Sequence, residues 1–330
     1  MAERALLYCA GGGIGDSLVA SVVARALHQR FAAVDALTLA SHAALLERVP
    51  DVDGVSIDAG DERALARRIA EGGYRACVVT WATARTARVA QLAGVPVRVG
   101  QARRIYSFRF TDRVVVRSER GDVTSHWSDI LLDFARAIGC DTGDRSYRFV
   151  PTGDDEREAE GLGTGGDFII LNPCNAVASQ RRWPIEAWAV LAKVLQERWG
   201  TRVLVSGSSA DAPIADAIVE RAGVAGEIVS IAGRTSIGGF GALARSARAF
   251  VGITTGSMHV AAAVGCPTVG IFPFQSDFPE RWAPLGAHTA VVRPSYPCHK
   301  GDTKERCPDY ACIANLDIPR ILTAVESLVS

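Results

Sequence analysis

The 330-residue sequence predicts an α/β fold built from two parallel-sheet domains. Strand-like runs alternate with helical patterns of about ten to fifteen residues, which is typical of parallel sheets with helices on both faces. This alternation restarts after a polar, acidic and glycine-rich stretch at 150–167, and the chain is longer than one hydrophobic core usually covers. We therefore expect two Rossmann-like domains, at 1–150 and 151–330, that face a central cleft.

The first half begins with the apolar run ALLYC and then alternates regularly. Its expected strands lie at 5–10, 35–40, 54–57, 75–80, 96–99 and 112–116. Its expected helices lie at 16–30, 41–48, 61–71, 84–93 and 125–138. Open sheets of this kind bind their ligands beyond the carboxyl ends of the strands.

The second half contains runs such as FIILNP and RVLVSG, whose continuous Val, Ile and Leu content is typical of strands buried on both faces. Its expected strands lie at 168–172, 202–206, 228–231, 249–253, 268–272 and 289–293. Its expected helices lie at 185–198, 210–222, 236–246, 257–264 and 317–329. The last of these helices could also pack back on the first domain.

Charge and composition narrow the function. The chain has 36 basic and 36 acidic residues, which removes the broad basic field expected of a nucleic-acid-binding protein. No apolar run approaches the ~20 residues that cross a bilayer, and the N-terminus enters a strand without a signal-peptide pattern, so we expect a cytoplasmic protein. Cys9, Cys77, Cys174 and Cys266 lie in apolar or small-residue contexts and are expected to be buried thiols.

Residues 10–20, AGGGIGDSLVA, place a glycine-rich turn between the first strand and the first helix, and the turn ends on Asp16. The turn is neither G-x-G-x-x-G nor a lysine-bearing phosphate loop. The second strand is followed by Ser41 and His42 instead of the acid that a dinucleotide site requires. One interpretation is structural, a tight turn with Asp16 as the helix N-cap. The other is that Asp16 acts on a ligand.

Two stretches of the second half offer anion-binding groups. Arg181 and Arg182 precede a helix start marked by Trp183-Pro184 and could bind a phosphate, or remain solvated. The segment TTGSMH places the hydroxyls and amides of 254–257 at a helix N-terminus, which is a ready anion site. His259 lies in the first turn of that helix, a position that favours function over a purely structural role.

Five segments resemble, in order and spacing, the motifs of glycosyltransferase family 9, the ADP-heptose:lipopolysaccharide heptosyltransferases. They are GGGIGDSLVASVVARAL, NPCNAVASQRRWPIEAWAVLAKVL, VLVSGSSAD, TTGSMHVAAAVGCPTVGIF and PCHKGDTKERCPDYACIANLDIPRIL. The resemblance covers nearly the whole chain, and the T-G-x-x-H-x-A-A-A element is its most specific part. It implies a GT-B fold with the acceptor in the N-terminal domain and the nucleotide-sugar in the C-terminal domain. It also implies inverting, metal-independent transfer without a cofactor, with ADP-heptose as the expected co-substrate.

The resemblance also implies roles for individual residues. Asp16 matches the acid taken to be the catalytic base, and glycines such as Gly13 and Gly15 would let the acceptor approach the backbone closely. An Asp16 carboxyl with an unshifted pKa would be a weak base that accepts the proton late, as the acceptor hydroxyl acidifies. The implied donor-binding residues are Arg181, Arg182, Asp211, Thr254, Thr255, Gly256, Ser257 and His259.

Within this donor set, Arg181 and the turn amides would stabilise the leaving diphosphate. Thr254 stands where the family usually has an aspartate that holds the donor sugar, which leaves the identity of that sugar open. Two other functions therefore remain. One is a GT-B enzyme that uses a different ADP- or UDP-sugar, including protein glycosylation or epimerase activity. The other is a non-catalytic, nucleotide-binding relative.

The acceptor side carries weaker signals. A lipopolysaccharide precursor is anionic, so Arg103, Arg104, Arg109 and His126 are expected contacts, with ordinary surface charge as the alternative. The expected partners are therefore a nucleotide-sugar donor and an anionic glycolipid or glycan acceptor. Peripheral association with the inner membrane stays open.

A cysteine-bearing segment near the C-terminus could hold a metal. Cys298, Cys307 and Cys312, with the histidine after the first of them, could supply soft ligands to zinc or iron, but their spacing is wider than in a compact zinc knuckle. We expect instead a reduced loop without a metal or disulfide, with Lys300 and Lys304 near the mouth of the cleft.

Overall fold

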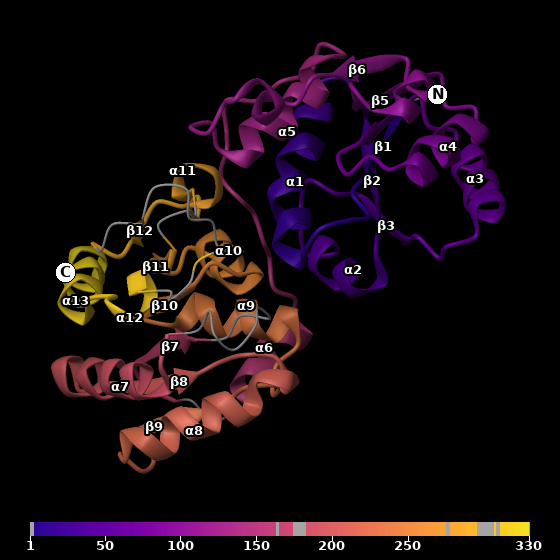
Figure 1. The fold of residues 1–330 in the computed structure, drawn as a ribbon. Coiled ribbons are helices and arrows are strands. Elements are labelled where there is room, and N and C mark those ends of the chain that lie inside the picture. Colours follow the sequence, from indigo (N-terminus) through magenta and orange to yellow (C-terminus); the bar gives the residue numbers. More distant parts are fainter. Residues whose placement is uncertain are drawn as a thin grey trace. The chain divides into compact units, whose positions relative to one another are not determined.

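The computed structural model describes residues 3–162, 165–173, 183–274, 278–295, 307 and 311–329. The chain divides into two compact units, Met1–Val150 and Pro151–Ser330. Each unit contains one six-stranded sheet in which every paired strand is parallel to its neighbour (Figure 1).

The first sheet has the strand order β3-β2-β1-β4-β5-β6. Its strands are β1 (Arg4–Tyr8), β2 (Ala33–Thr38), β3 (Gly54–Ile57), β4 (Ala76–Val79), β5 (Val97–Gln101) and β6 (Asp112–Val114). Its helices are α1 (Ile14–Leu27), α2 (Ala40–Leu46), α3 (Glu62–Glu71), α4 (Ala84–Leu92) and α5 (Trp127–Arg136), with the 3₁₀ turns η1 (Ile105–Arg109) and η2 (Arg117–Arg120). Helix α1 packs against α2 and α5, and α3 packs against α4, so the two groups cover opposite faces of the sheet (Figure 1).

Strand β1 shows why this sheet forms. Residues Ala5–Tyr8 are fully or almost fully buried, because β1 pairs with β2 on one side and β4 on the other while helices cover both faces. A continuous apolar run is therefore required here, in place of the apolar–polar alternation of a half-exposed strand.

The second sheet has the order β12-β11-β10-β7-β8-β9, which is the same topology as the first when its strands are counted from β7. Its strands are β7 (Phe168–Asn172), β8 (Arg202–Val205), β9 (Ile228–Ser230), β10 (Ala249–Ile253), β11 (Thr268–Ile271) and β12 (Thr289–Val292). Its helical elements are α6 (Gly153–Glu160), α7 (Ile185–Trp199), η4 (Ser209–Asp211), α8 (Ala212–Ala222), α9 (Ile237–Ser246), α10 (Gly256–Ala263), α11 (Pro279–Trp282), α12 (Ala311–Ala314) and α13 (Ile318–Val329).

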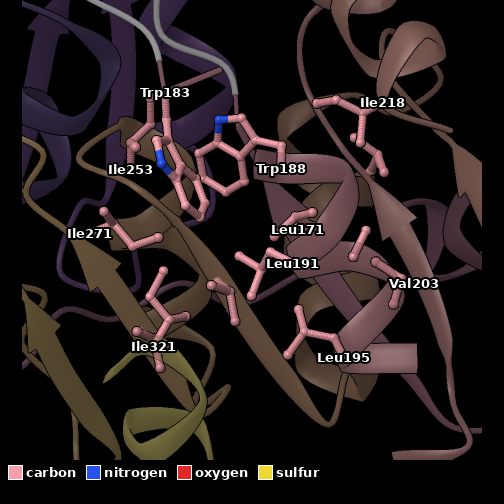
Figure 2. Close-up of a cluster of buried hydrophobic side chains, with 14 of the residues drawn as sticks. Leu171, Trp183, Trp188, Leu191, Leu195, Val203, Ile218, Ile253, Ile271 and Ile321 are labelled. Atoms are coloured by element: carbon pink, nitrogen blue, oxygen red, sulfur yellow. The ribbon is translucent and has the colours of Figure 1, made fainter. Parts of the chain in front are cut away.

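The core of the second unit is centred on two tryptophans. The rings of Trp183 and Trp188 meet edge-on, with centroids 4.9 Å apart, and Trp188 lies on α7 over the apolar face of the sheet (Figure 2). Ile321 of α13 joins the same cluster, so α13 packs on strands β10, β11 and β12 of its own unit. Pro184 occupies the N-cap position of α7, one residue before the first helical residue.

The expected fold class is confirmed, since both units are α/β with the Rossmann strand order 3-2-1-4-5-6. Each expected strand and helix is present, with ends that differ by a few residues. The short elements η1, η2, α11 and α12 were not expected, because four or five residues are too few for a periodic pattern. Within the described ranges, no helix combines the length and apolar character needed to span a membrane.

Candidate functional site

The first candidate site lies at the carboxyl end of β1, where the strand order reverses between β1 and β4. Ligands of open α/β sheets bind at this position. After β1 the chain passes through a glycine turn, and α1 starts at Ile14 with Gly13 as its N-cap. Asp16 is the third residue of the helix, and the Gly13 N–H donates to Asp16 Oδ2 at 2.5 Å. The alternative in which Asp16 is itself the N-cap is therefore wrong.

Two of the turn glycines are required by the packing of this chain. A Cβ on Gly11 would lie 2.8 Å from Trp81 Cβ. Gly12 has φ +72°, and a Cβ there would overlap the Asp16 carboxylate. Gly13 has ordinary extended backbone angles, and a Cβ there would meet only Asp16 Oδ2, at 3.5 Å. The proposed approach of an acceptor at Gly13 and Gly15 stays a prediction.

Asp16 is half-buried, and its environment makes it a stronger base than an ordinary aspartate. Burial raises the pKa of Asp16 above the usual value, and this effect outweighs the Gly13 N–H and nearby His42, which both lower it. Among the described residues, no hydrogen bond reaches Asp16 Oδ1, so this oxygen is available to a proton donor from outside the protein.

His42 contacts Ser17, the residue that follows Asp16 in the chain. Ser17 Oγ and His42 Nδ1 are 2.9 Å apart, and both side chains are buried. Burial lowers the pKa of His42, although the charge of Asp16 opposes the shift, so the imidazole is neutral at pH 7. In the sequence, this histidine stood out only because it lies where a dinucleotide site would have an acid.

Aromatic side chains from three separate segments form two ring pairs, one of which includes Trp81 against Gly11 of the turn. Trp81, which follows β4, stacks on Trp127 of α5 with ring centroids 6.1 Å apart. The ring of His126, the N-cap of α5, lies 6.4 Å from that of Tyr147. Burial raises the pKa of Tyr147, and the negative charge of Asp16 contributes to the shift. His126 was expected at the site from the sequence, whereas Trp81, Trp127 and Tyr147 were not, because no local pattern links residues so far apart in the chain.

The expected acceptor residues differ in how they are held. His126 Nδ1 accepts from the Ser128 N–H at 3.2 Å and so caps α5. Arg103 and Arg104 are both exposed, and Arg104 pairs with Glu119 at 2.7 Å. In the described part of the chain, no hydrogen bond or ion pair joins either arginine to Asp16. Their role as acceptor contacts stays a prediction.

The second candidate site lies at the carboxyl end of β10, at the equivalent reversal point of the second sheet. The chain passes through Thr254 to Thr255, the N-cap of α10, and Gly256 and Ser257 form the start of the helix. Thr255 makes no side-chain cap, and its Oγ1 is buried without a hydrogen-bond partner among the described residues. Buried His259 is the fourth residue of α10. The structure therefore brings the expected hydroxyls and first-turn amides together at one helix N-terminus.

Asn172, the last residue of β7, contributes a second buried polar group at this edge. Its side chain donates from Nδ2 to Ser206 Oγ at 2.9 Å, while Oδ1 has no partner in the described ranges. Gly252 of the neighbouring strand pairs with Asn172, and a Cβ on Gly252 would lie 2.9 Å from Asn172 Cβ. Buried polar atoms are normally satisfied, so these two adjacent strand ends are suited to a polar ligand. The signal missed in the sequence was a polar residue that ends an otherwise apolar strand.

Asp211 has a local structural function. Its Oδ2 accepts from Ser208 N at 3.0 Å and from Ser208 Oγ at 2.6 Å, which closes the turn of η4. A contact with the donor is not needed to explain this aspartate, and that role stays a prediction.

Several expected site residues cannot be placed. Arg181, Arg182, Cys174, Cys298, Lys300 and Lys304 lie outside the described residues. Cys307 is half-buried and Cys312 is buried. Cys9, Cys77 and Cys266 are buried as expected, and burial raises the pKa of each thiol to about 12. The described part of the chain contains no group of three metal-ligating side chains.

Comparisons with known proteins agree with this architecture. The family model for glycosyltransferase family 9 (heptosyltransferase) matches residues 62–310. Lipopolysaccharide heptosyltransferase 2 of Escherichia coli K12 is 25% identical over 316 residues, which are 88% of this chain and 89% of that protein. Lipopolysaccharide heptosyltransferase 1 of Pseudomonas aeruginosa is 30% identical over 168 residues, so the match spans 45% of this chain and less than half, 44%, of that relative.

The fold has the same architecture as a solved heptosyltransferase. The structure of E. coli ADP-heptose lps heptosyltransferase II superimposes with a TM-score of 0.80 at 21% identity, covering 98% of each chain. Two Rossmann-like units with candidate sites at their sheet reversal points define a GT-B protein. The chain belongs to glycosyltransferase family 9, the heptosyltransferase family.

Proposed function

We propose that this protein is an inverting glycosyltransferase that moves a heptose from ADP-heptose to a hydroxyl of a lipopolysaccharide core or related glycan acceptor. Family membership and the likeness to the solved E. coli ADP-heptose lps heptosyltransferase II support this reaction. The observation that carries the proposal is the Asp16 carboxylate, which has one oxygen held by Gly13, the other free of described partners, and a raised pKa.

Asp16 acts as the general base in this proposal. The acceptor hydroxyl oxygen attacks the anomeric carbon on the face opposite the diphosphate, its proton passes to Asp16 Oδ1, and the bond to the diphosphate breaks with its electron pair. ADP leaves, and the configuration inverts. The raised pKa brings the carboxylate closer to the acidity of the hydroxyl as the anomeric carbon becomes cationic, which strengthens proton transfer.

The donor diphosphate binds at the start of α10 in this proposal. The first-turn amides of α10 and the Thr255 hydroxyl can donate to phosphate oxygens, and their interaction strengthens as charge grows on the leaving group. Arg181 adds a guanidinium to the same diphosphate. The donor is a co-substrate, and the proposal includes no resident cofactor or metal.

Thr254 favours a second candidate, transfer of a different sugar from an ADP- or UDP-donor. The side chain at this position follows β10 directly, and a threonine lacks the carboxylate with which relatives are expected to hold the donor sugar. A panel of ADP- and UDP-sugars separates the two candidates, with nucleotide release measured with and without a heptose-deficient lipopolysaccharide acceptor. Acceptor-dependent release from ADP-heptose alone is the expected result, and acceptor-dependent release from another donor would select the second candidate.

The partners follow from the reaction. The acceptor is an anionic glycolipid or glycan, and the enzyme works in the cytoplasm at the inner-membrane surface where such a lipid is assembled. Release of nucleotide without acceptor, or binding of nucleotide without any release, would instead fit an epimerase or a non-catalytic relative.

A further inference from the structure

The short turn η1 (Ile105–Arg109), which follows β5, displays apolar side chains that the fold does not bury. Ile105 is 97% exposed and Phe108 is 59% exposed. Single exposed apolar residues are common, but here two lie three residues apart on one 3₁₀ turn, where side chains at this spacing project in the same direction.

Hydrogen bonds fix the conformation of η1 while the side chains of Ile105 and Phe108 remain exposed to solvent. Ser107 Oγ donates to the Gln101 carbonyl at 2.7 Å and accepts from the Arg104 N–H at 3.0 Å. Tyr106 is anchored through its hydroxyl, which donates to the Ala82 carbonyl at 2.5 Å. Within the described ranges, Arg103 is the only non-glycine residue with positive φ, +59°, a strained conformation that persists only where the surroundings enforce it. The exposure of Ile105 is therefore built into the turn.

Basic residues are concentrated in the segment that contains this turn, although the chain as a whole is neutral. Residues 98–120 contain seven arginines and two acids. Arg104 pairs with Glu119 and Arg117 pairs with Asp133, so five of the seven arginines have no ion pair among the described residues. Arg103 and Arg120 are exposed, and no described residue pairs with their side chains. The Arg109 guanidinium lies 4.8 Å from the centre of the Phe108 ring, which places a cation beside one of the exposed apolar groups.

We propose that η1 docks on the surface of an anionic phospholipid bilayer, with Ile105 and Phe108 inserted at the level of the headgroups and the flanking arginines paired with lipid phosphates. Two apolar side chains are too few for a stable protein interface, whereas insertion of a few apolar groups combined with basic residues is sufficient for reversible membrane binding. The charge of the segment selects an anionic surface over a neutral one.

This inference rests on the proposed function, because it names the surface on which a lipid-borne acceptor is met. The turn is coupled to the first candidate site within the same unit: Tyr106 binds the carbonyl of Ala82, and the preceding Trp81 packs against Gly11. Docking through η1 would therefore hold the glycine turn of Asp16 at a fixed position relative to the bilayer.

Co-sedimentation of the full-length protein with vesicles tests the proposal without donor or acceptor. Vesicles of phosphatidylcholine alone are compared with vesicles that contain about one-third phosphatidylglycerol. The wild type should sediment with the anionic vesicles only. The double variant Ile105→Ser/Phe108→Ser should lose about tenfold or more of this affinity. The matched control Val190→Ser, which alters a residue 51% exposed on α7, should bind like wild type.

Thermal unfolding of all three proteins verifies that the surface substitutions leave the fold intact, and transfer to a water-soluble acceptor should be unchanged in the double variant. Equal binding to neutral vesicles, no binding by the wild type, or full binding by the double variant would overturn the proposal. Dimerisation that depends on Ile105 would also overturn it and assign the turn to a contact between copies. Vesicle binding needs no catalysis. The binding result therefore stands whether or not the protein shows transferase activity.

Discussion

Two helix starts in this protein use the same acid position in different ways. At the start of α6, Thr152 is the N-cap, and its N–H and hydroxyl both donate to Asp155 Oδ2, at 2.7 and 2.9 Å. At the start of α1, the N-cap is Gly13, which has no side chain and donates only its N–H to Asp16. Asp155 is 2% exposed and accepts two hydrogen bonds from Thr152. Asp16 is half-buried and has one oxygen free of described partners.

The difference teaches how an ordinary helix-capping motif can become a reactive group. Hydrogen bonds to a carboxylate stabilise its ionised form and lower its basicity. Replacement of the N-cap side chain by hydrogen removes one such bond, while burial of Asp16 raises its pKa. The α6 turn is therefore a stabilising cap, and the α1 turn gives up part of that stabilisation to hold a base.

The largest expected effect comes from Asp16→Asn. The amide cannot accept the acceptor proton, so kcat should fall by about 100-fold or more while donor affinity, measured by calorimetry, stays near that of wild type. The matched control Asp155→Asn should lower the unfolding temperature and leave kcat per folded molecule unchanged. Retention of more than about one-tenth of wild-type kcat in Asp16→Asn, a loss below ~1.4 kcal/mol of barrier stabilisation, would contradict the assignment.

The same variant makes a prediction about stability. The pKa of Asp16 is raised on folding, so its favourable contribution is complete below the unfolded-state pKa and is lost as the pH rises through the folded-state value. Asp16→Asn removes this loss and should have a higher free energy of unfolding than wild type at pH 7. Denaturant titration should show the difference narrowing as the pH is lowered. If the variant were less stable than wild type at pH 7, ionised Asp16 would not destabilise the folded protein, which would contradict a raised pKa for Asp16.

A smaller effect is expected from Gly12→Ala. The new Cβ would overlap the Asp16 carboxylate and displace it, which should reduce kcat by about tenfold or more. Gly94→Ala is the control, since Gly94 has a similar φ of +68° and nothing within 4 Å of the added Cβ. Both variants should lose about 1–2 kcal/mol of stability from the left-handed backbone. Equal kcat in the two variants would show that the position of the carboxylate does not matter.

Gly13→Ser should convert the open turn into a closed one. The backbone angles at Gly13 accept any residue, and the serine hydroxyl could donate to Asp16 as Thr152 does to Asp155. We expect stability to stay equal or rise by a few tenths of a kcal/mol, with kcat reduced about three- to tenfold because the carboxylate becomes a weaker base. Steady-state kinetics measure kcat, and denaturant unfolding measures stability. Raised stability with unchanged kcat would show that the added cap stabilises the helix without weakening the base, which would contradict the prediction.

The comparison of the two turns also shows the limit of sequence analysis. Buried strands such as β1 and β7 are recognised from continuous apolar residues, because their local composition is dictated by burial on both faces. The sequence points to Asp16 as the candidate base, which stays a prediction, whereas the interpretation of Asp16 as the helix N-cap was wrong, because Gly13 holds that position. An N-cap and a third-position acid differ by hydrogen-bond geometry that spacing alone does not specify.

The groups around the turn were harder to predict. Trp81 packs against Gly11 of the turn, and the charge of Asp16 contributes to the raised pKa of Tyr147, although both residues are more than sixty positions from Asp16 along the chain. Only the strand order brings these segments together. The exposure of Ile105 was equally hidden, since an apolar residue in a five-residue turn carries no periodic signal of its environment. Local sequence therefore predicted the elements, and the topology determined which side chains meet.

The role of Asp16 is tested most directly by the pH dependence of kcat/KM for the acceptor. It is measured with saturating donor in the wild type and in Gly13→Ser. An ordinary aspartate has a pKa of about 4. Because burial raises the pKa of Asp16, the acid limb of the wild-type profile should lie at a higher pH than that ordinary value. The added hydroxyl of Gly13→Ser should shift that limb to lower pH, since it stabilises the carboxylate. Identical limbs in the two proteins, or a wild-type limb at or below the ordinary value, would contradict the account.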